Sequence, residues 1–386
     1  MLKTLRLAML FLLITFRTAF AASNPYGISD EVDEGLKQGF QLLFNLQFKE
    51  AEATLGSLAS LKKDQPMVAL AEVVRHWWEL SIDVMEISPN ASQPFLEAAD
   101  RCLKLSNDAI AAGDSRGSAH LAMGTTLGLM SRWSAANRAW VPAYLRGIKS
   151  SNYLEQLLLK NKKASDAYMC LGTFNYAREL IRKRSGVPDP DDTGKLSLGL
   201  DQLRKAYESG TYFRQASGLM LAGILTNDDP SKAVPLLREL REELPQSAFV
   251  HMILVTALYN SGDIDAMEIE ANDLLSKAES GDYTPNFKTQ GHFAKGLVAF
   301  RQKSWKEAAE NFSRAVEVGT RRNPYATWAH LYQGYAYDAL GQRKKAVEKY
   351  NIVLKLPRRY ASHDHAKNRL QKPFRPSDPE MKKLEV

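Results

Sequence analysis

Apolar residues recur along most of this 386-residue chain with the three- and four-residue spacing of helices that bury one face. The segment from Ala98 to Ala112 is one clear amphipathic example. No run alternates apolar and polar residues with period two, which would be the pattern of a half-buried strand. The pattern therefore predicts an all-α protein.

A second, longer spacing lies on top of this helical pattern. His120, His292 and His330 are each followed four residues later by a glycine. Twelve residues after each glycine comes an alanine, and four after that an aromatic residue: Ala136 with Trp140, Ala308 with Phe312, and Ala346 with Tyr350. Gly39, Ala51 and Leu55 repeat the spacing near the N-terminus, and the segment around His251 repeats it loosely. Such regular spacing indicates tandem helical hairpins.

The small residues let two antiparallel helices approach closely, and the aromatic residue is expected to fill the gap toward the next hairpin. We predict about eight hairpins, with a helical extension over 149–163 and an inserted loop from Arg182 to Gly194. The hairpins are expected at roughly residues 28–63, 66–112, 116–148, 164–210, 212–245, 247–280, 288–320 and 324–358.

At these residues the chain resembles the tetratricopeptide repeat family. The family's small, turn and aromatic positions 8, 11, 15, 20 and 24 are filled in the last repeat by Gly334, Tyr337, Gly341, Ala346 and Tyr350. In another repeat, Ala233 and Pro245 fill positions 20 and 32. The resemblance implies a right-handed αα superhelix with a concave groove. The order of segments around Gly172 and Gly199 is also loosely similar to the eukaryotic branch of this family linked to inclusion-body clearance.

Three regions follow from the composition along the chain. Residues 1–21 have a basic start, an apolar run from Leu7 to Phe16 and a small-x-small end at Ala19-Phe20-Ala21, which predicts a signal peptide and export to the periplasm or the extracellular space. A short uncleaved anchor is the alternative. Residues 22–358 form the predicted solenoid, without a later membrane span, and residues 359–386 read as a basic, Pro-containing flexible tail.

Charge argues against a nucleic-acid partner. The formal net charge is +7, and removal of the signal segment with Lys3, Arg6 and Arg17 lowers it to +4. A nucleic-acid binder is expected to concentrate basic residues on one face. The apolar share of 45% and the charged share of 25% are those of an ordinary folded protein.

The motifs for chemistry are weak, so we expect no enzymatic activity and no cofactor. The segment Gly113-Asp114-Ser115-Arg116-Gly117 matches G-x-S-x-G, but this nucleophile motif needs a strand before the serine, and here a helix precedes it. We expect an interhelical turn. No P-loop, G-x-G-x-x-G, H-E-x-x-H or C-x-x-C is present.

Metal binding is not expected either. Equivalent histidines in neighbouring hairpins, such as His292 and His330, would lie about 8–10 Å apart, too far to share an ion. We expect them to be flat packing residues. Two further sets are too small for a site, namely the acidic turn with Asp189, Asp191 and Asp192 and the pair His363 and His365. Cys102 and Cys170 are either two buried thiols or, after export, a disulfide.

The resemblance places positions 2, 5, 9, 12 and 13 of each first helix in the groove. In the last three repeats these positions include Asn260 and Asp338, and they lack the Lys and Asn that clamp a terminal carboxylate in some relatives. The groove is instead aromatic, which suits a protein or peptide partner with apolar anchors. The candidate partner-binding residues are Tyr259, Phe293, Phe300, Arg301, Trp328 and Tyr335. Three alternatives stay open: aromatic residues buried between repeats, a solenoid associated with an enzyme, and a solenoid that binds a lipid or small molecule.

Overall fold

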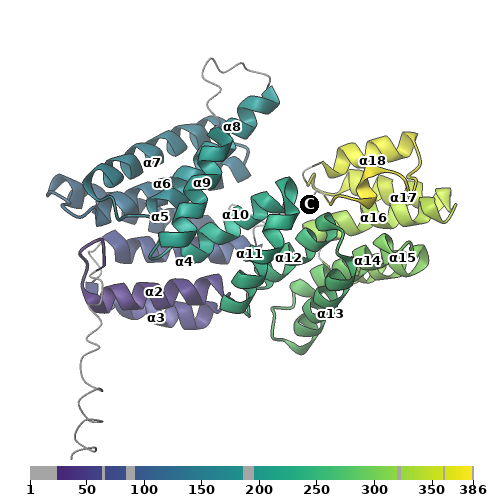
Figure 1. The fold of residues 1–386 in the computed structure, drawn as a ribbon, viewed down its shortest axis with the longest axis horizontal. Helices are drawn as coiled ribbons and strands as arrows, with labels where there is room; N and C mark the ends of the chain where they lie inside the picture. The colour runs from purple at the N-terminus through teal and green to yellow at the C-terminus, as the bar shows by residue number, and fades with distance from the viewer. Residues whose placement is uncertain are drawn as a thin grey trace, which may run out of the picture.

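The computed structural model describes residues 24–62, 66–83, 92–185, 195–319, 323–359 and 361–384. Within these ranges seventeen α-helices follow one another and no strand occurs, so the predicted all-α superhelix of about eight hairpins is confirmed (Figure 1). None of the described helices is both long enough and apolar enough to cross a membrane. The predicted signal segment 1–21 and the acidic turn with Asp189, Asp191 and Asp192 lie outside the described residues.

The described helices pair in chain order into eight hairpins, close to the predicted bounds. They are α2 (Asp30–Phe44) with α3 (Phe48–Lys62), α4 (Pro66–Asp83) with α5 (Gln93–Ala111), α6 (Ser118–Ala136) with α7 (Trp140–Lys160), α8 (Ala167–Ser185) with α9 (Lys195–Ser209), α10 (Arg214–Asp228) with α11 (Pro230–Glu243), α12 (Ala248–Ser261) with α13 (Ile264–Ser280), α14 (Phe287–Arg301) with α15 (Trp305–Val318), and α16 (Pro324–Ala339) with α17 (Arg343–Lys355). The predicted extension 149–163 is largely the second half of α7.

In two hairpins the glycine lets the paired helices approach closely, as predicted, but the aromatic residue packs on the glycine of its own hairpin, and of the two only Phe312 also contacts the next hairpin, at Tyr332. A Cβ added to Gly296 would lie 2.5 Å from the ring of Phe312, and one added to Gly334 would lie 2.4 Å from the ring of Tyr350. Glycine therefore lets these helices touch through an aromatic ring.

The third hairpin departs from this rule, and the expectation for Trp140 is wrong. Trp140 is exposed, and Gly124 meets Leu154 in its place. In an antiparallel hairpin, a residue far before the turn faces one equally far after it. Gly124 lies twelve residues before the end of α6, so its partner lies well inside α7 and not at the start of that helix, where Trp140 stands.

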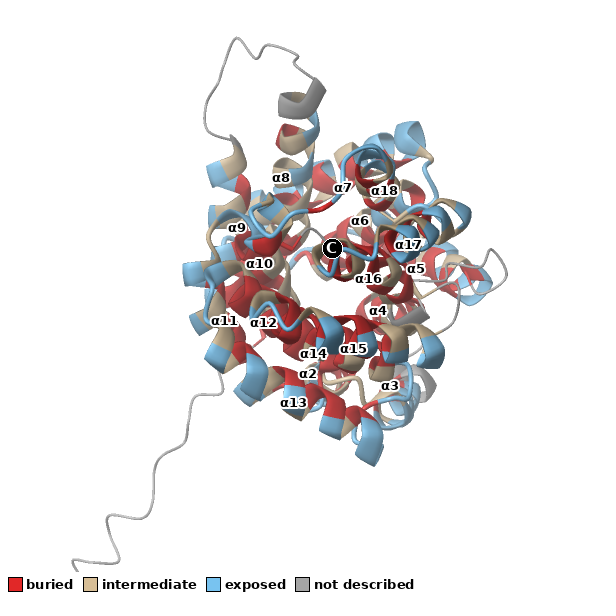
Figure 2. Ribbon diagram, turned by 90° about the vertical axis from the view of Figure 1, so that its right-hand side faces the viewer, coloured by how far each residue is buried: buried red, intermediate tan, exposed pale blue. Residues whose placement is uncertain are grey.

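The superhelix is tight enough for its first hairpins to contact hairpins far along the chain. The ring of Trp78 on α4 lies 6.1 Å from that of Phe249 on α12, and the backbone N–H of Gln246 donates to the side chain of Asn45 at 2.8 Å. Phe40 on α2 packs edge-on against Tyr212 at 6.1 Å. Buried residues accordingly line the inner faces of the helices (Figure 2).

A buried carboxylate joins three distant segments at this closure. Asp166, just before α8, accepts hydrogen bonds from the Tyr26 hydroxyl at 2.7 Å and from the backbone N–H groups of Thr211, Tyr212 and Phe213 at 3.1, 2.8 and 2.8 Å. The Tyr212 hydroxyl donates to Asp33 at 2.5 Å. Burial, together with the neighbouring carboxylates, raises the pKa of the Tyr26 and Tyr212 phenols well above the usual value.

Helices α8 and α9 touch backbone to backbone, which gives a prediction for Gly172. A Cβ at Gly172 would lie 2.7 Å from the carbonyl oxygen of Gly199, and backbone cannot yield as a flexible side chain does. Gly172→Ala is expected to lower the free energy of unfolding by about 2 kcal/mol, measured by urea denaturation. Gly223→Ala on α10, where a Cβ meets nothing within 4 Å, is expected to raise it by about 0.5 kcal/mol. Equal effects of the two changes would contradict this packing.

Candidate partner-binding groove

The prediction of a flexible tail beyond residue 358 is wrong for the described part of that region. Residues Ser362–Gln371 form α18, Pro379–Met381 form a 3₁₀ turn called η3, and the chain folds back over α16 and α17 (Figure 1). Phe374, Met381 and Leu384 are buried. Three apolar side chains within a basic, Pro-rich stretch find buried sites, which composition alone does not reveal. We call residues 372–384 the C-terminal segment.

Phe374 is the main apolar anchor of the C-terminal segment. Its ring stacks on Tyr335 at 4.9 Å and lies 5.5 Å from the ring of Phe300. Its backbone N–H donates to the carboxylate of Asp338 at 2.9 Å. The carboxylate is also held by Arg343 at 3.0 Å and by the hydroxyl of Tyr350 at 2.8 Å, so it is fixed where it meets the segment.

Groove side chains hold the main chain at the other end of the segment. The Tyr259 hydroxyl donates to the carbonyl oxygen of Glu380 at 2.7 Å, and Arg301 donates to that of Met381. The backbone N–H of Leu384 donates to the side-chain oxygen of Asn260 at 2.8 Å. The Arg301 guanidinium lies over the Tyr259 ring at 4.8 Å, which orients both donors.

Charges inside the C-terminal region stabilise this arrangement. Arg369 of α18 pairs with Asp378 and Glu380, each at 2.6 Å. Burial acts to raise the pKa of Glu380, but hydrogen bonds from His365 and Arg369 outweigh it and lower that pKa to about 2. Arg343 donates to the carbonyl oxygens of Arg369 and Leu370 at 2.8 and 2.7 Å, which fastens α18 to the start of α17.

The six candidate residues divide according to their contacts. Tyr259, Phe300, Arg301 and Tyr335 touch the C-terminal segment directly. Trp328 lies 6.2 Å from His365 on α18. Phe293 packs instead on Phe312, Tyr325 and Tyr332, which puts it in the core between repeats, one of the alternatives left open above.

Asn260 and Asp338 also bind the C-terminal segment, although they are not among the six candidate residues. Both occupy groove positions implied by the repeat pattern, at positions 13 and 12 of their first helices. The candidate residues are all aromatic or cationic, and Asn260 and Asp338 are neither. Their repeat positions alone would have identified them as groove residues.

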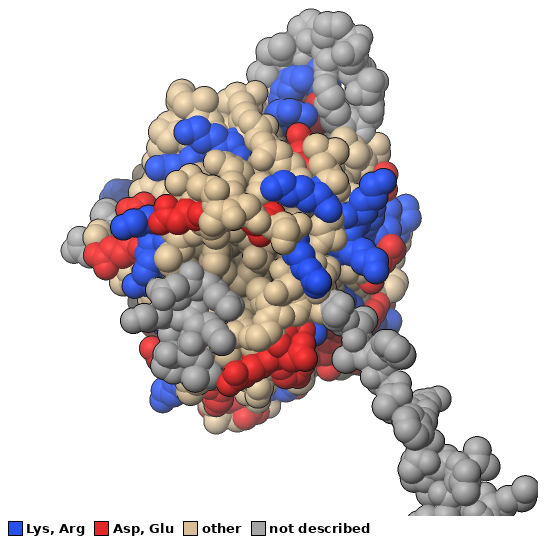
Figure 3. All heavy atoms as spheres, turned by 90° about the vertical axis from the view of Figure 1, so that its left-hand side faces the viewer, with Lys and Arg blue, Asp and Glu red and all other residues tan. Residues whose placement is uncertain are grey.

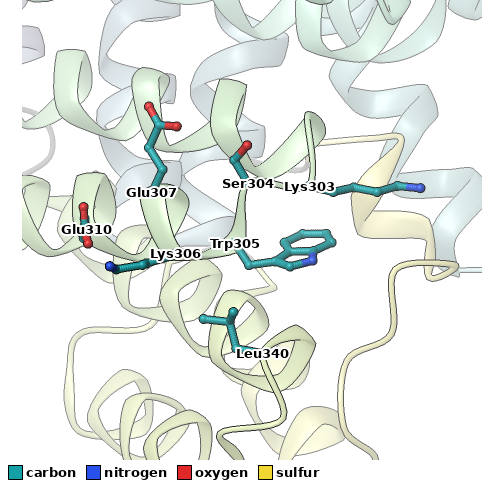
Figure 4. A pocket seen from close by; sticks show the side chains of 7 residues that line it. All are labelled: Lys303, Ser304, Trp305, Lys306, Glu307, Glu310 and Leu340. Carbon is teal, nitrogen blue, oxygen red and sulfur yellow. The ribbon is translucent and has the colours of Figure 1, made fainter.

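A shallow hollow opens at the edge of the groove, between the start of α15 and Leu340 (Figure 4). Trp305 and Leu340 are its apolar side chains, and the Trp305 ring also lies 6.5 Å from Phe374. Charged residues of both signs complete the lining, namely Lys303, Lys306, Glu307 and Glu310. Enclosed apolar walls are typical of small-molecule sites, so this hollow is better described as the rim of the groove.

The repeated histidines have different surroundings. His120 is held by Asp114 at 2.6 Å, and Asp114 also accepts from the backbone N–H groups of Gly117 and His120, so the G-x-S-x-G segment forms the turn that starts α6. His251 lies 3.0 Å from the Tyr283 hydroxyl and 2.9 Å from the carbonyl oxygen of Glu270. Burial lowers the pKa of His292, and it lowers that of His330 to about 4.

One cluster among the described residues has the composition of a metal site. Ligand atoms of His251, Glu270 and Asp273 lie within 4.8 Å of one another. Arg241 and Lys277 reach Asp273 at 2.8 and 3.5 Å, so protein cations already balance the charge of this carboxylate. His363 and His365 do not converge, because they face Leu356 and Glu380 respectively.

The two cysteines are free thiols. Burial raises the pKa of Cys102 to about 11 and that of Cys170 to about 12, which suppresses the reactive thiolate form.

No protein-family model and no curated protein matches the chain. Among solved structures it is similar to human IFIT1 in two dimeric complexes. The complex with m7Gppp-AAAA is 14% identical, with 85% of this chain and 74% of that chain covered and a TM-score of 0.43. The complex with PPP-AAAA is 15% identical, with 85% and 73% covered and a TM-score of 0.41.

Proposed function

We propose that this protein is an exported, tetratricopeptide-like interaction scaffold that binds an extended segment of a protein partner in its C-terminal groove. One observation carries the proposal: the groove already holds such a segment, supplied by the chain itself. The segment contributes apolar anchors at Phe374, Met381 and Leu384, and the groove supplies the matching side chains.

The contacts explain why a partner could compete. Tyr259, Arg301, Asn260 and Asp338 bind backbone groups, which every peptide offers, while the apolar anchors give selectivity. A partner segment with apolar residues at similar spacing can bind the same groove in place of the C-terminal segment. Nucleic acid fits it less well, because the groove holds the carboxylate of Asp338 and only Arg301 among the candidate residues is cationic.

A competition experiment tests the proposal. A fluorescent peptide with the sequence of residues 372–386 is titrated with the full chain and followed by anisotropy. Phe374→Ala weakens the internal segment without altering the groove, so it is expected to tighten peptide binding at least about tenfold. Adding Arg301→Ala is expected to reverse part of this gain. Lys372→Ala, at an exposed position, serves as the matched control.

Peptide binding that is absent from both the parent chain and Phe374→Ala would contradict the groove as a binding site. If a short RNA displaces the fluorescent peptide and unlabelled peptide does not, the partner of the groove is a nucleic acid and not a protein. Export is tested separately by N-terminal sequencing of the protein from its native host, and a cytosolic chain that still begins at Met1 would contradict it.

A further inference from the structure

The outward side of α7 carries four large apolar side chains that face solvent. Trp140, Val141, Tyr144 and Leu145 are 62%, 70%, 50% and 53% exposed. They fall at positions i, i+1, i+4 and i+5, so they share one side of the first turns of the helix. We call these four residues the α7 face. Apolar groups gathered in this way contribute little to folding and typically mark an interaction surface.

The α7 face is presented by a firmly held helix. On its inner side the Ser131 hydroxyl donates to the carbonyl oxygen of Ala143 at 2.6 Å, and Arg146 donates to Ser134. A Cβ at Gly147 would clash with the ring of Phe174 on α8. That ring lies 6.1 Å from Tyr144 and extends the aromatic surface, with Arg178 stacked over it at 5.6 Å.

The stretch of sequence that contains the α7 face is basic. Residues 115–154 contain no Asp or Glu and five basic residues: Arg116, Arg132, Arg138, Arg146 and Lys149. Arg138 and Lys149 are both exposed. Arg138 lies just before α7, and Lys149 lies one helical turn after Leu145. Figure 3 shows one end of the molecule, where Lys and Arg are spread among uncharged surface and Asp and Glu lie in several places, with one group at the lower edge.

We propose that the α7 face docks on an anionic lipid surface, as a peripheral contact independent of the groove. Trp140 and Tyr144 insert at the level of the headgroups, Val141 and Leu145 reach the acyl boundary, and Arg138 and Lys149 bind the lipid phosphates. Exposed tryptophan and tyrosine with basic neighbours are typical of protein surfaces that bind at the membrane interface.

Other partners fit these residues less well. A nucleic acid would use the cations and stack on the rings, but the aliphatic Val141 and Leu145 have no role there. A second copy of the chain would bring Arg138 and Lys149 of two molecules together, which like charges oppose. An anionic bilayer satisfies both the apolar and the basic groups at once.

Vesicle co-sedimentation of the full chain tests the proposal. The vesicles are phosphatidylcholine alone or phosphatidylcholine with phosphatidylglycerol at a ratio of about seven to three. Binding is expected on the anionic vesicles, with affinity at least about tenfold lower on neutral ones and at high salt. Trp140→Ser with Leu145→Ser is expected to remove it, and Arg138→Glu with Lys149→Glu to weaken it about tenfold. Leu159→Ser, at an exposed position on the far part of α7, is the matched control.

Tryptophan emission gives a second measurement. It is expected to shift to the blue with anionic vesicles, and the shift is expected to be lost in Trp140→Phe. Because every variant keeps the N-terminal segment and the groove, a loss of binding is specific to α7, and helical circular dichroism checks folding. Equal binding by parent and double variant, or no binding to anionic vesicles, overturns the proposal. If the double variant instead loses self-association or RNA binding, the α7 face serves that partner and the lipid proposal is wrong.

Discussion

Replacing Asp166 by Ala is expected to lower the free energy of unfolding by about 3 kcal/mol, the largest change in global stability that we predict for a single residue. The Asp166 carboxylate accepts hydrogen bonds from one phenol and three backbone N–H groups, all of them buried except the half-buried N–H of Thr211. Alanine would leave these donors without an acceptor, and a buried unsatisfied donor costs about 1 kcal/mol or more. The lost contacts also join the N-terminal residues to α10, so the closure of the superhelix weakens with them.

Urea unfolding at pH 7 measures this effect. Tyr26→Phe removes one of the four donors and is expected to cost about 1 kcal/mol. Asp201→Ala is the matched control, because that carboxylate is mainly exposed and forms only a surface pair with Arg204, worth less than about 0.5 kcal/mol. A change of under about 1 kcal/mol for Asp166→Ala would show that the donors find water instead.

Phe374→Ala is expected to loosen the C-terminal segment by about 3 kcal/mol, which raises the population of the open groove about a hundredfold. The Phe374 side chain is only 2% exposed and packs on Tyr335, Phe300 and Trp305. Its truncation removes the main apolar anchor while the contacts near Glu380 and Leu384 stay. The effect is therefore local, unlike that of Asp166→Ala.

Hydrogen exchange measures the opening directly. The backbone N–H groups of Phe374 and Leu384, which are bonded to Asp338 and Asn260, are expected to exchange much faster in Phe374→Ala. Trypsin is expected to cleave sooner after the exposed Lys382 and Lys383. Helices α2 to α5 should exchange at the parent rate, and so should the whole chain in Lys372→Ala. Faster exchange throughout the molecule would mean that the segment supports the entire fold.

Part of the candidate site follows from repeat position. The pattern puts Tyr259, Phe300, Arg301 and Tyr335 in a groove because equivalent residues of successive hairpins face the same side. It does not distinguish Phe293, whose ring turns into the core against Phe312, from these neighbours. Nor does it show what fills the groove, since Phe374, Met381 and Leu384 are isolated apolar residues in a stretch with prolines at 373, 376 and 379, where the repeat pattern has ended.

The sequence by itself determined the all-α class, the hairpins and the small residues, such as Gly296 and Gly334, at which paired helices approach closely. These features depend on helix period and on spacings within about forty residues, so local physics encodes them. Only the tertiary structure decided that Trp140 faces solvent, that Asp166 joins segments more than a hundred residues apart, and that the C-terminal segment lies in the groove. Each depends on contacts between distant parts of the chain, and no local pattern carries the geometry that brings those parts together.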